Sequence, residues 1–514
     1  MSKYTPKTEK MLALLAELWL LLQRAQQAFR QERVFRRVVA LLFGELFALG
    51  RHTVTQLLRT LGAIDQDWSA WYRLFSRPRF VEAVLAGQLL VETLRHVAEP
   101  TPYVTTMDGV RIPRSGQYVA GVSWWPGWNT APFNPGLARG QRFVEVAWLT
   151  PVEESYCRAV PLRWYPAPTQ KAVPSAAKPC SEWEAGLAGW HWVRKEMDAH
   201  GRIDQWLVGL GDGSFDTQGI WRELPEQTVL VIRCARNRAL YALPSAQKPR
   251  RGAPTPYGKR LPAPWQYLRK RKQLTPLTIR IRGRERRLRY RVVGPLLVEG
   301  APDRPLFLIA VGGRGKKVGG RHPRRVYRQP VYYLVNAVRG SDGTWPLPFP
   351  AEQLLGWAWQ RWECEVAHRE MKSSLGIGEK QCWGPRAALR RTTDPETRRL
   401  PHYTTLWLPQ RAKPHGLGVR GEGQPDRPLR FDTFGTHPGR MEVKRAGCHT
   451  GIAECWNGRG QRMELGLGTN PEGCMISPTG LGHPLLLGRF DKSRSLWYIV
   501  TCLQTWGGLG SEVS

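Results

Sequence analysis

The first 98 residues carry apolar side chains at intervals of three and four positions, which is the period of an amphipathic helix. The pattern is clearest in Lys10–Phe29, Arg33–Leu49 and Arg79–Val97. We therefore expect an N-terminal helical domain over residues 1–98.

A shorter helical pattern fills the interval Gly50–Arg77. Thr53 or Thr55 can cap a short helix that Gly62 ends, and a further helix is expected to begin near Asp67. A short helix, a turn containing glycine and a second helix suit a helix-turn-helix DNA reader. A plain helical bundle has nearly the same pattern, so both interpretations stay open.

From Tyr103 the pattern changes to short runs of alternating or continuous apolar residues. These runs read YVTTMDG, QYVAGVSWW, RFVEVAWLT and CRAVPLRWY. A helical segment at Ser181–His200 precedes the run QWLVGLGDG, Thr228–Val338 is strongly β-like, and Leu354–Leu375 is helical again. Such alternation predicts an α/β or α+β core.

The last part of the chain, from about Pro385, has a different composition. Gly, Pro and Arg are frequent and no continuous apolar face is visible, which is typical of loop or disorder. We hypothesise that the reading frame has shifted after about Arg390. The tail would then be non-native sequence, and the chain would fold poorly and be inactive.

The net charge of the chain indicates which class of molecule it binds. The chain has 514 residues with 76 Lys and Arg against 42 Asp and Glu, a net charge of +34. An excess of this size points first to nucleic acid, although a soluble protein with solvated charge is the alternative. A content of 42% hydrophobic residues with 23 Trp indicates a folded chain.

Neither a membrane nor an oxidising compartment is expected. The most apolar early run, Met11–Leu22, has about a dozen residues, too few to span a bilayer. The N-terminus MSKYTPKTEK has no adjoining signal-peptide pattern. Nine scattered cysteines without a Cys-x-x-Cys spacing fit a reducing interior and indicate neither a structural zinc site nor a disulfide framework.

Three acidic residues are candidates for chemistry. Asp108 closes a strand-like run in TTMDGVRIPRSG, Asp212 closes another in WLVGLGDGSFD, and Glu365 lies in the helix QRWECEVAHREMKSSLG. Three hard oxygen donors from separate elements suit Mg²⁺ or Mn²⁺, and two such ions can support phosphodiester cleavage. Most strand-end aspartates, however, are turn formers or helix caps.

The helix around Glu365 has an unusual polar stripe. Arg361, Glu365, His368 and Lys372 follow at spacings of four, three and four residues, so they share one helix face. A metal-binding carboxylate between two phosphate-gripping cations would need this arrangement. A solvated face with weak ion pairs is the alternative. His368 is expected to lie beside the metal ligands, to face DNA or simply to be packed.

The segment RWECEVAHREMKSSLG resembles the glutamate motif of DDE transposases of bacterial insertion sequences. In the group that it resembles, this motif reads Tyr-x2-Arg-x3-Glu-x6-Lys. Arg361, Glu365 and Lys372 match it, whereas Ala358 stands at the Tyr position.

The two aspartate segments resemble the other motifs of this family, in the same order. In the first, Asp108, Arg111 and Gly116 match, and Val110 stands where the family has Thr. In the second, Asp212 is followed by Gly and the aromatic Phe215. Three motifs in order make the resemblance specific, and it covers roughly residues 50–390.

The resemblance implies an α/β fold with an RNase H-like catalytic core, a β-rich insertion before the glutamate helix and an N-terminal helical domain. The domains expected are 1–98, helical and a candidate helix-turn-helix DNA-binding domain; 99–227, the first part of the core; 228–345, the β-rich insertion; 346–390, the glutamate helix of the core; and 391–514, the atypical Gly/Pro/Arg-rich tail.

The activity implied is that of a DNA transposase. Asp108, Asp212 and Glu365 would hold two Mg²⁺ or Mn²⁺ ions for strand cleavage at the element ends, and the freed 3′-OH would attack target DNA. Arg361 and Lys372 would hold the flanking phosphates. The partners implied are terminal repeats, target DNA and a second copy in a synaptic complex, in the bacterial cytoplasm at the nucleoid. A non-catalytic DNA-binding protein or inactive remnant is the alternative.

Further basic residues are candidates for DNA contact. In IRCARNRALY, Arg236 and Arg238 would share one face of an extended segment, with Arg233 on the other, and could contact the DNA backbone. The basic loop Gln247–Gln273 contains Trp265, which suits stacking on an unpaired base. A solvated strand and a flexible loop are the respective alternatives.

Overall fold

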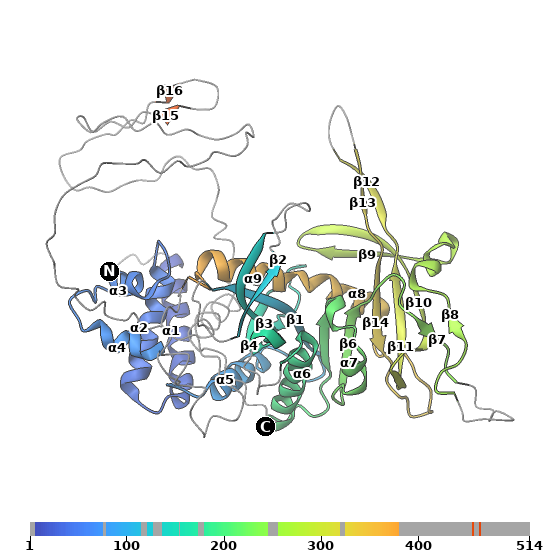
Figure 1. Cartoon of the computed structure of the whole chain (residues 1–514), viewed down its shortest axis with the longest axis horizontal. Helices are drawn as coiled ribbons and strands as arrows, with labels where there is room; N and C mark the ends of the chain where they lie inside the picture. The colour runs from blue at the N-terminus through green and yellow to red at the C-terminus, as the bar shows by residue number, and fades with distance from the viewer. Residues whose placement is uncertain are drawn as a thin grey trace, which may run out of the picture. The chain divides into compact units, whose positions relative to one another are not determined.

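The computed structural model describes residues 6–75, 79–114, 121–126, 136–153, 155–172, 179–244, 255–318 and 324–379 (Figure 1). In the separate unit Arg411–Arg489 it also describes a strand pair, β15 (Cys455–Trp456) and β16 (Arg462–Met463). Apart from this pair, the predicted 391–514 tail and the proposed frame shift lie outside the described residues.

The N-terminal region is helical, as predicted. Its helices are α1 (Pro6–Ala25), α2 (Glu32–Phe47), α3 (Val54–Thr60), α4 (Trp68–Tyr72) and α5 (Glu82–Leu94), with short 3-10 turns η1 (Gln26–Ala28) and η2 (Arg73–Phe75). Apolar residues on α2, α3 and α4 pack together in a small core of their own.

Local capping chemistry explains where α3 and α4 begin and end. The Thr53 hydroxyl accepts a hydrogen bond from the backbone N–H of Gln56, and the Asp67 carboxylate accepts one from Ser69. Gly62 follows α3 at φ +67°, a conformation that glycine adopts without steric cost. The short helix, glycine turn and second helix predicted for this interval are therefore present.

A mixed sheet of twelve strands follows this region in the chain. Its strands are β1 (Tyr103–Pro113), β2 (Val122–Pro126), β3 (Leu137–Leu149), β4 (Ala159–Pro166), β5 (Leu207–Gly211), β6 (Thr228–Arg233), β7 (Leu240–Tyr241), β8 (Arg260–Leu261), β9 (Thr275–Ile281), β10 (Arg284–Val298), β11 (Ala301–Val311) and β14 (Val331–Asn336). A separate hairpin joins β12 (Arg314–Val318) and β13 (Arg324–Arg328).

The strand order is β2-β3-β1-β5-β6-β14-β11-β10-β7-β8, with β4 also paired to β3 and β9 to β10. Strand β1 runs antiparallel to β3 and parallel to β5, and β5 runs parallel to β6. The remaining pairs are antiparallel. A mixed α/β architecture is therefore confirmed.

Helices cover both faces of the sheet around β3. The helices are α6 (Glu182–Ala199), α7 (Gln218–Arg222), α8 (Ala351–Gln360) and α9 (Trp362–Ser374), with 3-10 turns η3 (Gln170–Ala172), η4 (Gly213–Phe215), η5 (Pro264–Leu268) and η6 (Arg271–Gln273). Val146 lies against Gly189 of α6, whereas its neighbour Glu145 contacts Cys364 of α9. Because side chains alternate along a strand, α6 and α9 lie on opposite faces.

The β9–β10 hairpin docks on the glutamate helix. At its tip, Arg282 Nε lies 2.6 Å from Oε1 of the buried Glu363 on α9, and Tyr290 donates a hydrogen bond to Glu352 on α8. The predicted insertion, residues 228–345, begins with β6, which pairs with β5 in the central sheet. The domain boundaries themselves remain predictions.

Candidate active site

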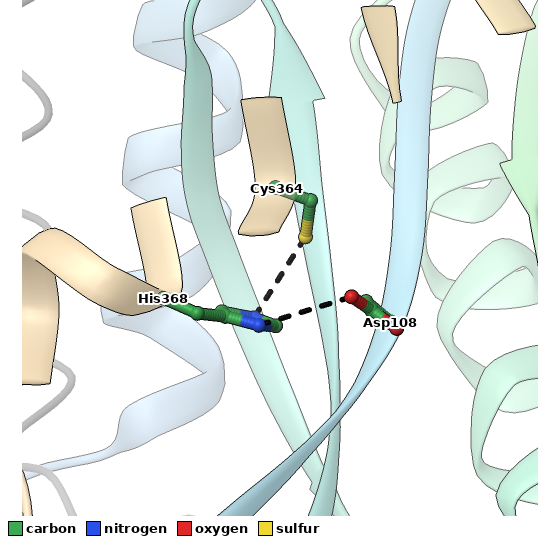
Figure 2. Close-up of side chains that lie close together, drawn as sticks. All are labelled: Asp108, Cys364 and His368. Atoms are coloured by element: carbon green, nitrogen blue, oxygen red, sulfur yellow. Dashed lines mark hydrogen bonds and ion pairs between the residues drawn. The ribbon is translucent and has the colours of Figure 1, made fainter. Parts of the chain in front are cut away.

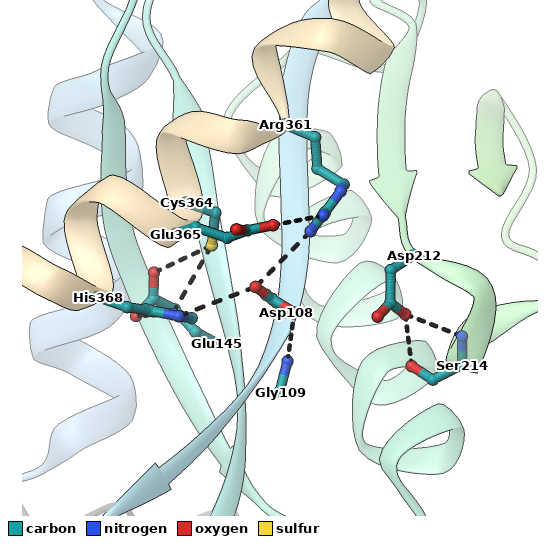
Figure 3. A network of polar contacts seen from close by, with 9 residues as sticks. All are labelled: Asp108, Gly109, Glu145, Asp212, Ser214, Arg361, Cys364, Glu365 and His368. Atoms are coloured by element: carbon teal, nitrogen blue, oxygen red, sulfur yellow. Dashed lines mark hydrogen bonds and ion pairs between the residues drawn. The ribbon is translucent and has the colours of Figure 1, made fainter. Parts of the chain in front are cut away.

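The three predicted carboxylates come from three different elements (Figure 3). Asp108 lies on β1, Asp212 follows β5 directly, and Glu365 is in the first turn of α9. In the parallel β1–β5 pair, Thr106 lies opposite Leu210, so Asp108 and Asp212 each follow this pair by two residues. The register therefore places both aspartates at the same level of the sheet.

Arg361 links two of these carboxylates. Its Nη2 lies 2.8 Å from Oε1 of Glu365, and its Nη1 lies 3.6 Å from Oδ2 of Asp108 (Figure 3). Burial alone would lower the pKa of Arg361, but the nearby acidic groups, Asp108 foremost, outweigh it and raise that pKa. The guanidinium is thus a permanent counter-ion between the two acids.

Asp108 is at the centre of the electrostatics. Burial raises the pKa of its carboxyl, and His368 and Arg361 oppose that effect. Asp212 and Glu365 add to the rise, because like charges nearby favour the protonated form. Both other predicted carboxylates therefore act electrostatically on Asp108.

Asp212 and Glu365 line a common cleft of about 960 Å³ together with Arg361. Its other lining residues are Gly213, Ser214, Arg233, Cys234, Ala235, Arg236, Trp265, Leu268, Arg269, Gln329, Pro330 and Tyr332. Asp212 accepts hydrogen bonds at Oδ1 from the backbone N–H and hydroxyl of Ser214, at 2.9 and 2.6 Å, which holds it at the rim of this cleft. The cleft joins acidic and basic groups, as a phosphodiester site needs.

The glutamate helix is interrupted where the sequence predicts a continuous one. Helix α8 ends at Gln360 and α9 begins at Trp362. Arg361 between them keeps helical angles, φ −49° and ψ −30°, so the polar stripe continues across the junction. Ala358, at the position of the family's Tyr, is buried in the core.

Lys372 lies at the far end of the stripe, in the last turn of α9. The neighbouring protein partly desolvates its ammonium, which lowers the pKa, while Asp108 and Glu145 act in the opposite direction. Its charge thus acts on Asp108, which Arg361 also contacts.

Glu145, on β3, was not among the predicted site residues. It pairs in register with Asp108 across the β1–β3 ladder and is fully buried. His368 lies between the two acids, with Nε2 3.2 Å from Glu145 Oε2 and Nδ1 3.9 Å from Asp108 Oδ2 (Figure 3). The signal in the sequence was a single glutamate inside the apolar run RFVEVAWLT, since a charge in a strand buried on both faces requires a partner.

His368 is packed beside the candidate metal ligands, which was one of the positions expected for it. Burial works against its charged form, but Glu145 and then Asp108 outweigh burial and raise the pKa of the imidazole. The ring therefore bridges two acids on adjacent strands.

The predicted basic residues after β6 separate into two groups. Arg233 and Arg236 line the cleft. The extended segment assumed for Arg238 is not observed, because the chain turns at Arg236–Asn237. Arg238 Nε instead lies 3.0 Å from Oδ2 of Asp216, whose pKa burial raises.

Trp265 also lies in the cleft, held by a cation–π contact. The guanidinium carbon of Arg269 is 4.4 Å from the centre of its ring. A guanidinium therefore lies over one face of the Trp265 ring. The same cleft is also lined by Asp212 and Glu365.

A sequence model of the family described as DDE superfamily endonuclease matches residues 25–288. The chain belongs to this family. The match confirms the resemblance to DDE-type transposases, and it includes Asp108, Glu145 and Asp212 but ends before Glu365. The comparison with curated proteins gave no match for this endonuclease. Among its described helices, none has the length and apolar character to cross a membrane.

Proposed function

We propose that this DDE endonuclease is a transposase of a bacterial insertion sequence, with Asp108, Asp212 and Glu365 as its catalytic residues. The reaction is strand cleavage at the element ends followed by transfer of the freed 3′ ends into target DNA. The observation that carries the proposal is the convergence of three carboxylates from β1, β5 and α9 with Arg361.

An RNase H-like core supports this reading. Strands β4, β3 and β1 are antiparallel neighbours, and β5 and β6 continue the sheet in parallel with β1. This arrangement, three antiparallel strands followed by two parallel ones, is consistent with an RNase H-like core. The strands from β7 to β14 follow β6 in the chain and lie within the proposed β-rich insertion, residues 228–345.

The donor set fits magnesium or manganese. Three carboxylates give hard oxygen ligands. Burial raises the pKa of Asp108, and the nearby Asp212 and Glu365 add to the rise, so a bound cation would be favoured between them. We assign Asp108, Asp212 and Glu365 as the groups that hold two such ions. When bound, divalent ions lower the pKa of water and stabilise a leaving oxygen.

The protein's own cations position the DNA backbone. Arg361 presents a planar fork beside Glu365, and Lys372 a point charge further along α9, so the two can hold phosphates on either side of the cleaved bond. Arg233 and Arg236 extend the positive lining of the cleft. Arg238 has a weaker case, since its guanidinium is paired with Asp216.

The β9–β10 hairpin offers a further basic surface that the sequence reading did not identify. Arg287 and Arg289 are exposed and alternate with buried Leu288 and Tyr290, so they share the outer face of β10. The hairpin tip is fixed to α9 through Arg282 and Glu363. We assign this outer face to backbone contacts with DNA near the site.

Recognition of the element ends is assigned to α3 and α4, and two protomers are expected to join two ends in a synaptic complex. The geometry of the short helix pair supports a helix-turn-helix reader. This assignment is tested separately from catalysis by measuring how tightly variants with changed exposed residues on α4 bind DNA that carries one element end.

The test is a nicking and strand-transfer assay on a supercoiled plasmid that carries the DNA flanking the gene. With Mg²⁺ the protein should nick this plasmid, and Glu365→Gln and Asp108→Ala should each reduce nicking at least 1000-fold, as expected for the loss of a metal ligand. Glu370→Gln is the matched control, because Glu370 is on the same helix but pairs with Arg158 outside the site.

DNA binding decides between the two candidate functions. The Glu365→Gln variant should retain DNA affinity within about 3-fold, since the carboxylate does not hold phosphates. Retained nicking by this variant contradicts the assignment of Glu365. Binding without any nicking by the unmodified protein would identify the alternative, a non-catalytic DNA-binding protein.

A further inference from the structure

Four potential metal ligands meet between β1, β3 and α9, on the inner side of the proposed magnesium site. Cys364 Sγ lies 3.7 Å from His368 Nε2 and 3.7 Å from Glu145 Oε1. His368 Nδ1 lies 3.9 Å from Asp108 Oδ2 (Figure 2). One ligand atom each from Asp108, Cys364 and His368 fall within 4.8 Å of one another.

These separations are close to those of a tetrahedral zinc site. With Zn–N and Zn–O bonds of about 2.0 Å and a Zn–S bond of about 2.3 Å, neighbouring ligand atoms are roughly 3.3–3.6 Å apart. The separations at His368 Nε2 and Cys364 Sγ, 3.2 Å to Glu145 Oε2 and 3.7 Å for each contact of Cys364, are close to this range. Asp108 contacts the other ring nitrogen, Nδ1, at 3.9 Å. Because an imidazole binds one ion through one nitrogen, binding at Nε2 requires the Asp108 carboxylate to move toward the ion.

The cluster also contains a fully buried carboxylate, Glu145, whose Oε2 accepts no hydrogen bond of good geometry. Its charged partner is His368, with Nε2 3.2 Å away. A buried carboxylate is costly without such a partner, and a bound metal ion would take the place of the imidazole's charge. Cys364 is fully buried as well, so the thiol is held in place rather than free to turn outward.

We propose that Cys364, His368, Asp108 and Glu145 form a binding site for Zn²⁺, distinct in ligand chemistry from the magnesium site. Sulfur and imidazole ligands select zinc, whereas magnesium prefers oxygen alone. The cysteine pattern of the sequence indicated no structural zinc site because Cys-x-x-Cys spacings detect only ligands close in sequence. Here the ligands come from three elements.

Zinc binding has a consequence for catalysis, and this part rests on the proposed function. Asp108 belongs to both ligand sets, so a zinc ion that holds it withdraws it from the magnesium site. Zinc binds a cysteine as its thiolate, so binding at Cys364 releases the thiol proton to solvent. Zinc is therefore expected to inhibit DNA cleavage.

Cobalt is the probe for the site, because Co²⁺ replaces Zn²⁺ and thiolate coordination produces a near-ultraviolet charge-transfer band. The full chain, stripped with EDTA, should bind Co²⁺ with this band, and Zn²⁺ should displace it. The chain has nine cysteines, so the result is read as a difference between variants. Cys364→Ser should lose one equivalent of the band and weaken Zn²⁺ binding at least 100-fold.

Two further variants separate a metal site from a hydrogen-bonded cluster. Cys157→Ser, a substitution of another buried cysteine outside the cluster, should leave the band unchanged. Glu145→Gln preserves shape and should weaken Zn²⁺ binding about 10-fold, the usual cost of a perturbed ligand environment. Equal Co²⁺ spectra for the unmodified chain and Cys364→Ser overturn the proposal and leave His368 as a bridge between two acids.

The inhibition is tested on the plasmid assay, in excess Mg²⁺ with Zn²⁺ equimolar to protein. Zinc should slow nicking at least 10-fold for the unmodified chain and less than 2-fold for Cys364→Ser. A cobalt thiolate band without zinc inhibition overturns the sharing of Asp108. If no protein nicks DNA even without zinc, the proposed function fails, whereas the cobalt result still decides the metal site.

Discussion

Replacing Arg361 by Gln tests whether its guanidinium acts as the counter-ion between Asp108 and Glu365, the two proposed catalytic acids that it contacts. At an effective dielectric constant of 20, the 3.6 Å contact with Asp108 and the 2.8 Å contact with Glu365 correspond to about 5 and about 6 kcal/mol of attraction. Desolvation and the partial exposure of all three side chains cancel most of this. We expect the metal-free variant to lose about 2 kcal/mol of stability, which lowers Tm by roughly 2 °C in a chain of this length.

The informative measurement is the effect of Mg²⁺ on Tm in each variant. A divalent ion offsets the repulsion that Arg361→Gln leaves, so Mg²⁺ should raise Tm more in Arg361→Gln than in the unmodified protein. Arg369→Gln, an exposed change on the same helix, is the control and should behave as the unmodified chain. An equal Mg²⁺ response in both proteins, or an unchanged Tm in EDTA, would refute the counter-ion role of Arg361.

Three further predictions concern other parts of the chain. The double change Arg287→Gln and Arg289→Gln should reduce the slope of log DNA affinity against log salt concentration by roughly 2, measured by titration at several salt concentrations. An unchanged slope would mean that the outer face of β10 makes no contact with the DNA backbone. Burial raises the pKa of Asp216, so the folded state holds the Asp216 proton more tightly than the unfolded state does. The stability of the unmodified protein relative to Asp216→Asn should therefore fall as pH rises from 3.8 through the raised pKa. A difference in Tm between the two proteins that does not change with pH contradicts this prediction. Gly209→Ala should destabilise the protein by about 1–3 kcal/mol, because the added carbon meets a neighbouring side chain at 2.5 Å, whereas Gly356→Ala, with open space around it, should not lower Tm.

Elements with local chemical signals could be predicted from the sequence. The helix at Ser181–His200 is observed as α6, and its start follows from a capping box in which Ser181 and Glu184 satisfy each other's backbone N–H groups. The turn after α3 follows from Gly62 in the same way. These signals depend only on residues within one helical turn, so they can be recognised in the sequence without knowledge of the fold.

The site could be predicted only in part, because part of it depends on register. No sequence pattern near either residue indicates that Glu145 lies opposite Asp108, because the pairing of β1 with β3 joins residues far apart in sequence. Arg238 is the converse case: its apparent place on an extended basic face disappears once the chain turns and Asp216 comes within 3.0 Å. Both differences arise from tertiary pairing, which periodicity does not detect.

One helix carries two kinds of ligand on adjacent positions, and this explains the odd composition of its polar stripe. Glu365 and Arg361 face the cleft, whereas Cys364 and His368 face Glu145 on β3, because consecutive helical residues point about 100° apart. Asp108 is contacted by both Arg361 and His368. Any change in how α9 packs on β3 therefore moves both of these neighbours of Asp108 together, and under the two proposals the hard and soft ligand sets would compete for Asp108.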